Sequence, residues 1–176
     1  IRKSFFKSKK GEYGYGDIFL GIRSPIIRMV AKENVHLSIS DTKKLIKSKY
    51  HEGPASFSNN GSRMYLTRSN YLHKKKGLDS VKHNNLKLYL SEKDSNGKWS
   101  ELTEFTYNSD NYSLGHATVT EDGKTMYFTS DMPGTKGLTD IWKSTLEGKN
   151  WSKPENLSKL NTEGREMFPF ISNNGN

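Results

Sequence analysis

The feature that most constrains the fold of this chain is one phrase of twelve residues that is repeated along it. SFSNNGSRMYLT at residues 56–67 returns as TVTEDGKTMYFT at residues 118–129, and a third copy begins with FISNNG at residues 170–175. The central glycines of the three copies lie 62 and then 52 residues apart. Because periods near 50 residues are typical of propellers and other repeat arrays, the spacing predicts one structural unit used several times.

Each complete copy of the phrase has the pattern of an antiparallel hairpin. A short apolar run leads into Asn60-Gly61 or Asp122-Gly123, and an alternating Met-Tyr-Leu/Phe-Thr run follows. These dipeptides favour tight turns because glycine, and to a lesser degree Asn and Asp, adopts a positive φ at low cost. We therefore expect a turn at each dipeptide, with a strand on either side of it.

The similarity between the copies extends beyond the hairpins. Later in each unit comes an apolar pair, Leu88-Tyr89 or Ile141-Trp142. A tryptophan followed by serine comes next, Trp99-Ser100 or Trp151-Ser152. An asparagine followed by a hydroxyl residue comes last, Asn108-Ser109 or Asn161-Thr162. We expect the aromatic rings at repeated positions to fill the space between neighbouring units; these pairs are Tyr65 and Tyr127, Tyr89 and Trp142, and Trp99 and Trp151. Four short strands per unit predict an all-β fold, a β-propeller of four-stranded antiparallel blades, with about three blades in this chain.

The same frame divides the whole chain into units. Residues 10–19 match residues 133–142, which places Asp17 at the position of Asp140. The chain begins without Met and ends inside a repeat, so we expect it to be a piece of a longer protein. The expected units of this partial propeller are the outer part of a blade at 1–50, whole blades at 51–107 and 108–160, and the start of the next at 161–176.

Composition and charge exclude several classes of protein. Cysteine is absent, which excludes disulfide frameworks, thiolate zinc sites and cysteine nucleophiles from this segment. No apolar stretch approaches the roughly 20 residues of a membrane helix. The formal net charge is +9, with lysine clusters at 7–10, 43–49 and 74–76. Because these clusters fall in different units and lack the interleaved aromatic residues that stack on bases, we expect solvated loops and no nucleic-acid partner.

The sequence contains no pattern that predicts catalysis. A Gly-x-Ser-x-Gly elbow, a His-Glu-x-x-His helix, a Walker loop and a dinucleotide fingerprint are all absent, so we expect no enzyme activity and no cofactor. His51 and His116 could contribute to a central metal ring, but packing and hydrogen bonding are the simpler expectation. Asp131 and Asp140 flank a glycine-rich loop that offers too few oxygens for calcium. We expect no metal, and we expect Asp140 to accept hydrogen bonds from turn amides.

Four whole phrases carry a further signal: YHEGPASFS at 50–58, FTYNSDNYSLGH at 105–116, YFTSDMPG at 127–134 and NTEGREMFPF at 161–170. They resemble the propeller of OmpA-family envelope proteins of Bacteroidetes, which is built of TolB-like and WD40-like repeats. The resemblance covers residues 45–176 and extends more loosely over the first 45. It implies a six-bladed propeller within a multidomain lipoprotein of the periplasm that is associated with the outer membrane.

The resemblance also implies a function. It predicts a noncatalytic propeller scaffold for protein–protein contacts in an envelope assembly, with other envelope proteins as partners and with type IX secretion or gliding motility as one branch of the family. Peptidoglycan would be bound only through a domain outside this segment. The alternative is a glycan-binding or glycan-processing propeller, which would require carboxylates and arginines that converge on the axis.

One segment departs from the pattern of this family. The Lys-rich insertion Leu72–Asn84 interrupts the second unit between its second and third strands. Long irregular loops on a rigid scaffold often carry function, so we expect an exposed, mobile loop whose Lys74, Lys75 and Lys76 contact a partner. Within it, Asp79-Ser80-Val81 matches the O-glycosylation pattern of exported Bacteroidetes proteins, so the resemblance marks Ser80 as a candidate glycosylation site.

Overall fold

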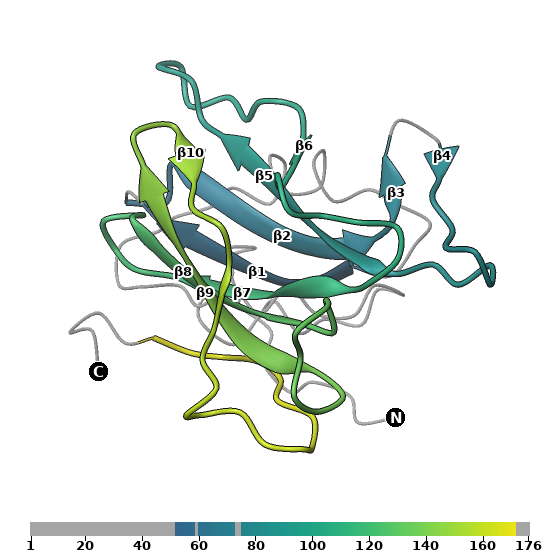
Figure 1. Ribbon diagram of the computed structural model, residues 1–176. Coiled ribbons are helices and arrows are strands. Elements are labelled where there is room, and N and C mark those ends of the chain that lie inside the picture. The colour runs from purple at the N-terminus through teal and green to yellow at the C-terminus, as the bar shows by residue number, and fades with distance from the viewer. Residues whose placement is uncertain (1–51, 59, 73–74, 172–176) are drawn as a thin grey trace, which may run out of the picture.

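The computed structural model describes residues 52–58, 60–72 and 75–171. The expectations for the first half-blade, for His51 and for Asp17 lie outside these residues. In the described part of the chain the fold is all-β and antiparallel, without a helix, and consists of two larger sheets and one small hairpin (Figure 1). The coarse fold class predicted from the repeat is therefore confirmed.

The two larger sheets follow one another along the chain. The first contains, in spatial order, β1 (Glu52–Ser58), β2 (Arg63–Ser69), β5 (Leu86–Glu92) and β6 (Thr103–Glu104). The second contains β7 (Leu114–Val119), β8 (Thr125–Ser130) and β9 (Asp140–Glu147), with β10 (Asn150–Trp151) and β11 (Glu155–Asn156) both paired to β9. Between β2 and β5, the small hairpin pairs β3 (Tyr71–Leu72) with β4 (Lys75–Lys76).

Both hairpins expected from the repeated phrase are present. β1 pairs antiparallel with β2, and the Gly61 amide donates to the Ser58 carbonyl over 3.1 Å at the turn. Asn60 and Gly61 have φ values of 54° and 77°, the positive values that this dipeptide was expected to supply. β7 pairs in the same way with β8, and the Gly123 amide donates to the Thr120 carbonyl over 2.9 Å.

The second sheet differs from the expected four strands because its outermost strand is divided into two short pieces. Trp151 of β10 pairs with Leu146, and Glu155 of β11 pairs with Lys143. Pro154 lies between these two pieces and has no amide hydrogen to donate to β9. The outer edge of the first sheet is also discontinuous, since Trp99 forms an isolated bridge with Lys93 before β6 begins.

The main core lies between the two sheets and follows from the alternation of side chains along the strands. Tyr65 and Leu88 point from the first sheet into this core, whereas Leu66 and Tyr89, their neighbours in sequence, belong to a second cluster on the opposite face. Most aromatic residues at the repeated positions are buried as expected, and Tyr127 is half-buried; the buried ones are Tyr65, Tyr89, Trp99, Trp142 and Trp151. Strand alternation therefore supplies apolar side chains to both faces of the first sheet.

β7, the inner strand of the second sheet, packs against both β1 and β2 of the first sheet. A Cβ atom on Gly115 would lie 2.5 Å from Cγ2 of Thr67, so only glycine fits there without movement of β2. The Tyr65 ring packs edge-on against Trp151, with 6.0 Å between the ring centroids. This packing places the inner strand of the second sheet directly against the first sheet.

One hydrogen bond between neighbouring units occurs twice at equivalent positions. The Val119 amide donates to Oγ of Ser56 over 3.2 Å, and the Ile171 amide donates to Oγ1 of Thr118 over 3.4 Å. In the repeated phrase, Ser56 corresponds to Thr118 and Val119 corresponds to Ile171. The third copy therefore makes the same backbone-to-side-chain hydrogen bond to the second sheet as β7 makes to the first.

Candidate functional site: the inserted segment and its polar anchor

The insertion between β2 and β5 is more regular than its sequence indicated. β3 and β4 form a short antiparallel pair in which Tyr71 lies opposite Lys76. At the base of this pair, the Gly77 amide and Nδ2 of Asn84 both donate to the Asn70 carbonyl, over 3.0 and 2.9 Å. The expectation of an irregular loop is therefore wrong for this hairpin, because strands of two residues are too short to show a sequence period. The mobility of the insertion stays a prediction.

Beyond the hairpin, residues 78–83 form a turn around Asp79; we call these residues the tip. Oδ1 of Asp79 accepts hydrogen bonds from the Val81 amide over 3.0 Å and the His83 amide over 2.7 Å. The Lys82 amide donates to the Asp79 carbonyl over 3.0 Å, and Lys82 has a φ of 65°. Asp79 is the only acidic residue in segment 71–84, and its side chain is turned toward this backbone, with 12% of its surface exposed.

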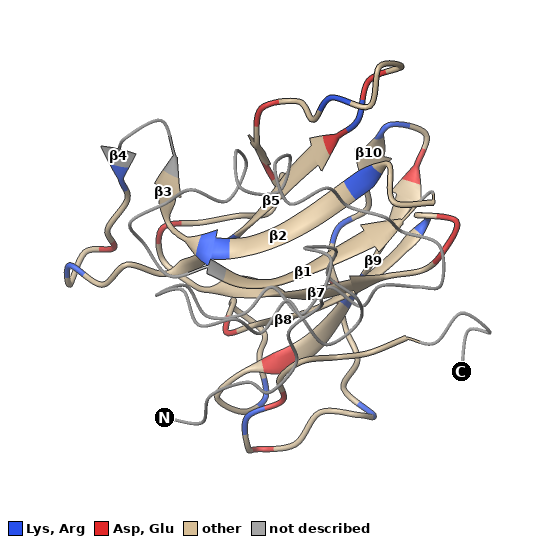
Figure 2. Cartoon of the chain, turned by 180° about the vertical axis from the view of Figure 1, so that it is seen from behind, with Lys and Arg blue, Asp and Glu red and all other residues tan. Residues whose placement is uncertain are grey.

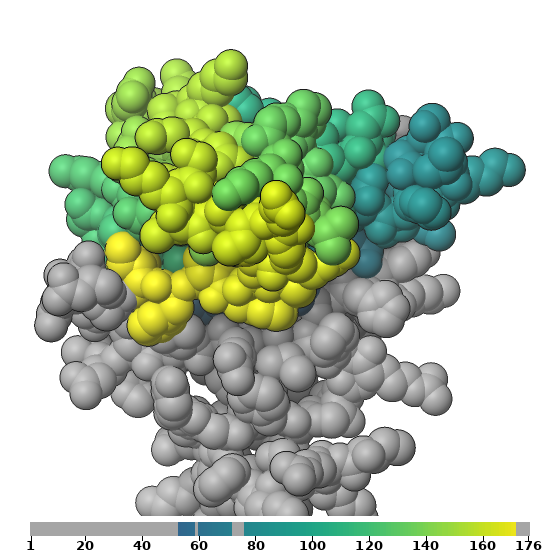
Figure 3. Space-filling view, turned by 60° about the horizontal axis from the view of Figure 1, so that its bottom comes forward, coloured from purple at the N-terminus to yellow at the C-terminus, as the bar shows by residue number. Residues whose placement is uncertain are grey.

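The residues expected to contact a partner lie on different parts of the insertion. Lys76 is exposed on β4, and Ser80 is exposed on the tip. Lys75 belongs to β4, whereas Lys74 lies outside the described residues. In the space-filling view, the insertion projects from one side of the molecule, away from the C-terminal residues (Figure 3).

The sequence analysis missed two apolar residues in the insertion. Leu78 is 40% exposed and Val81 is 65% exposed, although both are apolar residues in an otherwise polar segment. Lys82 and His83 beside them are also exposed. The signal that could have identified Leu78 and Val81 is their apolar character between charged neighbours in a segment that the repeat does not explain.

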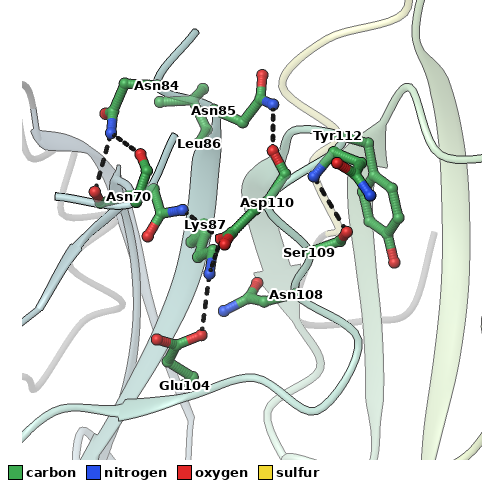
Figure 4. Close-up of polar contacts among 12 residues, drawn as sticks. Asn70, Asn84, Asn85, Leu86, Lys87, Glu104, Asn108, Ser109, Asp110 and Tyr112 are labelled. Atoms are coloured by element: carbon green, nitrogen blue, oxygen red, sulfur yellow. Dashed lines mark hydrogen bonds and ion pairs between the residues drawn. The ribbon is translucent and has the colours of Figure 1, made fainter. Parts of the chain in front are cut away.

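A polar network joins the base of the insertion to the first sheet and to the linker that leads into β7 (Figure 4). Nδ2 of Asn70 donates to Oδ1 of Asp110 over 2.6 Å, and Nζ of Lys87 lies 2.8 Å from the same oxygen. Lys87 is buried and also pairs with Glu104 on β6 over 3.3 Å. The hydrogen bond from Lys87, followed by that from Asn70, holds the pKa of Asp110 below its ordinary value. The carboxylate of Asp110 is therefore the point where β5 and the start of the insertion meet.

A second set of hydrogen bonds fastens the other end of the insertion. Nδ2 of Asn85 donates to the Asp110 carbonyl over 2.8 Å, and Oγ of Ser113 donates to Oδ1 of Asn85 over 3.3 Å. The Leu86 amide in turn donates to Oγ of Ser113 over 3.1 Å. Both ends of the insertion are thus joined to the linker that leads from the first sheet into β7, and we call residues 70, 85, 87, 104, 110 and 113 the polar anchor.

Asp140 has a comparable place in the second sheet. It is fully buried and accepts hydrogen bonds from the amides of Lys136 and Gly137 over 2.7 and 3.3 Å, and from Nδ2 of Asn156 over 2.6 Å. Burial raises the pKa of Asp140, but these three hydrogen bonds outweigh burial and leave its pKa below the ordinary value. The expectation that Asp140 accepts from turn amides is confirmed. Across 52–58, 60–72 and 75–171, no group of three or more potential His or carboxylate ligands is arranged to hold a metal ion.

The repeated asparagines, Asn108 and Asn161, each use the side-chain amide to hydrogen-bond to the backbone of a strand, β5 or β9. Oδ1 of Asn108 accepts from the Leu88 amide over 3.0 Å, while its Nδ2 donates to the Leu88 carbonyl over 2.8 Å. Asn161 makes the same two bonds with Ile141, over 2.8 and 3.0 Å. The sequence repeat identified these asparagines but not their role, which is to replace a strand partner with a side-chain amide.

His116 has a packing role, as expected, and lies within β7. Its φ of 52° places it at the bulge where the register between β7 and β8 shifts. Its amide donates to Oγ1 of Thr67 over 2.8 Å, and its Nδ1 lies 3.2 Å from Oγ1 of Thr129. The ring stacks on Phe168 at a centroid distance of 4.1 Å, and burial lowers the pKa of His116. Phe168, the equivalent residue of the third copy, has a similar φ of 55°.

Comparison with known proteins adds no relative to this description. No family model matches the chain, and no curated protein matches it. Within the part of the chain that the structure describes, there is no helix long and apolar enough to span a membrane. The assignment of a function therefore depends on the repeat and on the contacts of the described residues.

Proposed function

We propose that this chain is part of a six-bladed β-propeller that acts as a noncatalytic scaffold for protein–protein contacts in a bacterial envelope assembly. In this proposal, residues 51–107 and 108–160 are whole blades, 1–50 are the outer part of a preceding blade, and 161–176 begin the next one. The protein lies in the periplasm and is associated with the outer membrane as a lipoprotein.

The observation that carries the proposal is the repeated hydrogen bond between neighbouring units. Val119 bonds to Ser56, and Ile171 bonds to Thr118, at equivalent positions of successive copies. A contact that recurs between successive equivalent units implies that the same rotation and translation relate each unit to the next. Repeated rotation about one axis generates the closed ring of a propeller, which leaves only short, protected strand edges.

The noncatalytic role is supported by what the polar residues do. The buried charges of Lys87 and Asp140 hold loops and outer strands, and His116 bridges neighbouring strands and stacks on Phe168. These are the side chains that would otherwise be the natural candidates for acid–base chemistry. The exposed loops between the second and third strands are left to contact other molecules, which is the usual division of labour on a rigid scaffold.

The location in the envelope rests on the resemblance of whole phrases to the OmpA-family propellers. Other envelope proteins are the proposed partners, in type IX secretion or gliding, and peptidoglycan is bound only through a domain outside this segment. In the same proposal Ser80 carries a glycan, which its exposed position on the tip would permit. A mass spectrum of the peptide around Ser80 from natively expressed protein tests this; an unmodified peptide would remove the glycan.

The scaffold function can be tested by site-specific photo-crosslinking of the full-length protein in its native cells. A photoreactive residue is placed in turn at three exposed positions on different parts of the surface, Lys76, Glu101 and Lys149. We expect the protein in the outer-membrane fraction and discrete crosslinks to envelope proteins from at least one position. A cytosolic protein, or no crosslink from any position, would refute the proposal. Specific binding to a glycan array without any protein crosslink would favour the glycan-binding alternative.

A further inference from the structure

The tip presents a surface that the fold does not use. Leu78 and Val81 expose apolar side chains, and Lys76 and Lys82 expose ammonium groups close to them in the chain. Figures 1 and 2 show the loop after β4 at the far end from β10, with basic residues on β4 and at the end of the loop (Figure 2). Exposed apolar residues bordered by charge are characteristic of interaction sites.

The acidic residue of the tip does not neutralise this surface. Oδ1 of Asp79 accepts from the amides of Val81 and His83, and only 12% of its side chain is exposed. These bonds also restrict the backbone of the tip. A loop that is already in its bound conformation loses less conformational entropy on binding, so a small contact area can still give measurable affinity.

The polar anchor holds the tip in a fixed direction relative to the two sheets. Asn70 at one end of the insertion and Asn85 at the other both bond to Asp110, which in turn pairs with the buried Lys87. In the second sheet the corresponding loop is held by Asp140 within its own unit. It is also bonded to the start of the next unit, since the Leu138 amide donates to the Gly164 carbonyl over 2.8 Å. Both sheets therefore bond this loop to the next unit, and in the first sheet the bonds orient the insertion, which the repeat does not require.

We propose that the tip binds an acidic protein segment that carries an apolar side chain. Val81 and Leu78 contact the apolar side chain of the partner, and Lys76 and Lys82 pair with carboxylates beside it. This inference rests on the proposed scaffold function and adds the chemistry of the partner and the part of the surface that binds it. A protein is favoured over nucleic acid because segment 72–84 has no Phe, Tyr or Trp ring to stack on a base.

The probe for this inference is a phage-displayed library of random peptides, selected against the full-length protein. We expect enrichment of peptides with Asp or Glu beside an apolar residue. Selected peptides are then synthesised, and their Kd is measured by fluorescence anisotropy for the parent and for the variants V81S and K82E. Each variant should bind about tenfold more weakly, whereas K149E, a matched change at an exposed lysine of the second sheet, should bind within about twofold of the parent.

The role of the polar anchor is tested separately, since Asp110 does not belong to the tip. D110N keeps an oxygen that can accept from Asn70 but loses the charge that pairs with Lys87. D110A loses both interactions. We expect the affinity for the selected peptides to decrease in the order parent, D110N, D110A. A melting temperature above the temperature of the binding assay shows that each variant is folded. Equal affinity of all three folded proteins would show that the anchor does not position the tip.

Three results would overturn the docking inference. In the first, the selected peptides bind V81S and K82E as tightly as they bind the parent. In the second, the selection yields no acidic peptides. In the third, vesicles of anionic phospholipid bind the tip while no peptide does. Crosslinks from Glu101 or Lys149 but none from Lys76 would also remove the tip as the docking site while leaving the scaffold function intact. Absence of crosslinks from all three positions would remove the scaffold function itself.

Discussion

Lys87 and Asp140 occupy equivalent positions in the two sheets, and both are buried although their charges are opposite. Lys87 lies opposite Arg68 on β2, and Asp140 lies opposite Ser130 on β8, one residue before the matched apolar pair in each unit. Their partners in the outer strand are also equivalent, since Lys87 pairs with Glu104 and Asp140 accepts from Asn156. The two units therefore satisfy one buried polar position with two different pairs of residues.

This equivalence predicts that an Asp–Asn pair, like Asp140 and Asn156 of the second sheet, can replace Lys87 and Glu104 of the first. K87D alone should lower the free energy of unfolding by about 3–5 kcal/mol, because it removes the partner of two carboxylates and adds a third. The double variant K87D/E104N reproduces the Asp–Asn pair and should recover about 1 kcal/mol or more of that loss. Urea unfolding of the parent, both single variants and the double variant gives the coupling energy. Strict additivity of the two single changes would contradict the equivalence.

The aromatic core predicts large effects at both repeated tryptophans. W151A should cost about 3–5 kcal/mol, because Trp151 is buried and packs edge-on against Tyr65 of the first sheet and Phe105. W99A should cost a similar amount, since Trp99 is equally buried and packs against Phe57. Guanidinium unfolding measures both. A loss below about 0.5 kcal/mol at either position would mean that the ring does not contribute to the core.

The hydrogen bonds of Asn108 and Asn161 to the strand backbone predict two similar, smaller losses of stability. N108A and N161A each remove the acceptor of one strand amide, that of Leu88 or Ile141, and should each cost about 1–3 kcal/mol. N96A is a suitable control because Asn96 is exposed in a turn, and it should change stability by less than about 0.5 kcal/mol. Thermal unfolding of the three variants provides the comparison. Costs at Asn108 and Asn161 no larger than that of N96A would show that the side-chain amides do not replace a strand partner.

The buried imidazole of His116 predicts a dependence of stability on pH. Burial lowers the pKa of His116 below its ordinary value of 6.5, so the unfolded chain binds a proton at a higher pH than the folded protein does. The stability from neutral His116 is therefore fully present above pH 6.5 and is lost as the pH falls from 6.5 toward the lower pKa of the folded protein. H116N removes the titration and tolerates the positive φ of this position. Urea unfolding at several pH values should show a stability gap between parent and variant that narrows on acidification, and a constant gap would contradict the burial of the imidazole.

The repeat made the strands and turns predictable from sequence. Asn60-Gly61 and Asp122-Gly123 specify turns by local chemistry, and the alternating residues after them specify which side chains enter the core. The equivalence of Trp99 and Trp151 predicted their burial, because repeated positions share one environment. These predictions needed only local backbone preferences and the period of the repeat.

The polar anchor could not be predicted in the same way. Asp110 lies 40 residues from Asn70 and 23 residues from Lys87, so no local pattern brings the three together. The equivalence of Lys87 and Asp140 was hidden by their opposite charge, although the apolar pairs that follow them were matched. The hairpin β3–β4 was missed because its strands are too short to show alternation. The sequence therefore did not predict the polar contacts between residues far apart in the chain.

The most direct test of the propeller is an experimental structure of the longer protein that we expect to contain this chain. We predict that the segment containing Phe168 forms the innermost strand of a third sheet, with the Ile171 amide bonded to Thr118 as Val119 is to Ser56. We also predict that six such sheets close around one axis. A structure in which this strand leaves the second sheet, or in which the sheets form an open row without a common axis, would contradict the account.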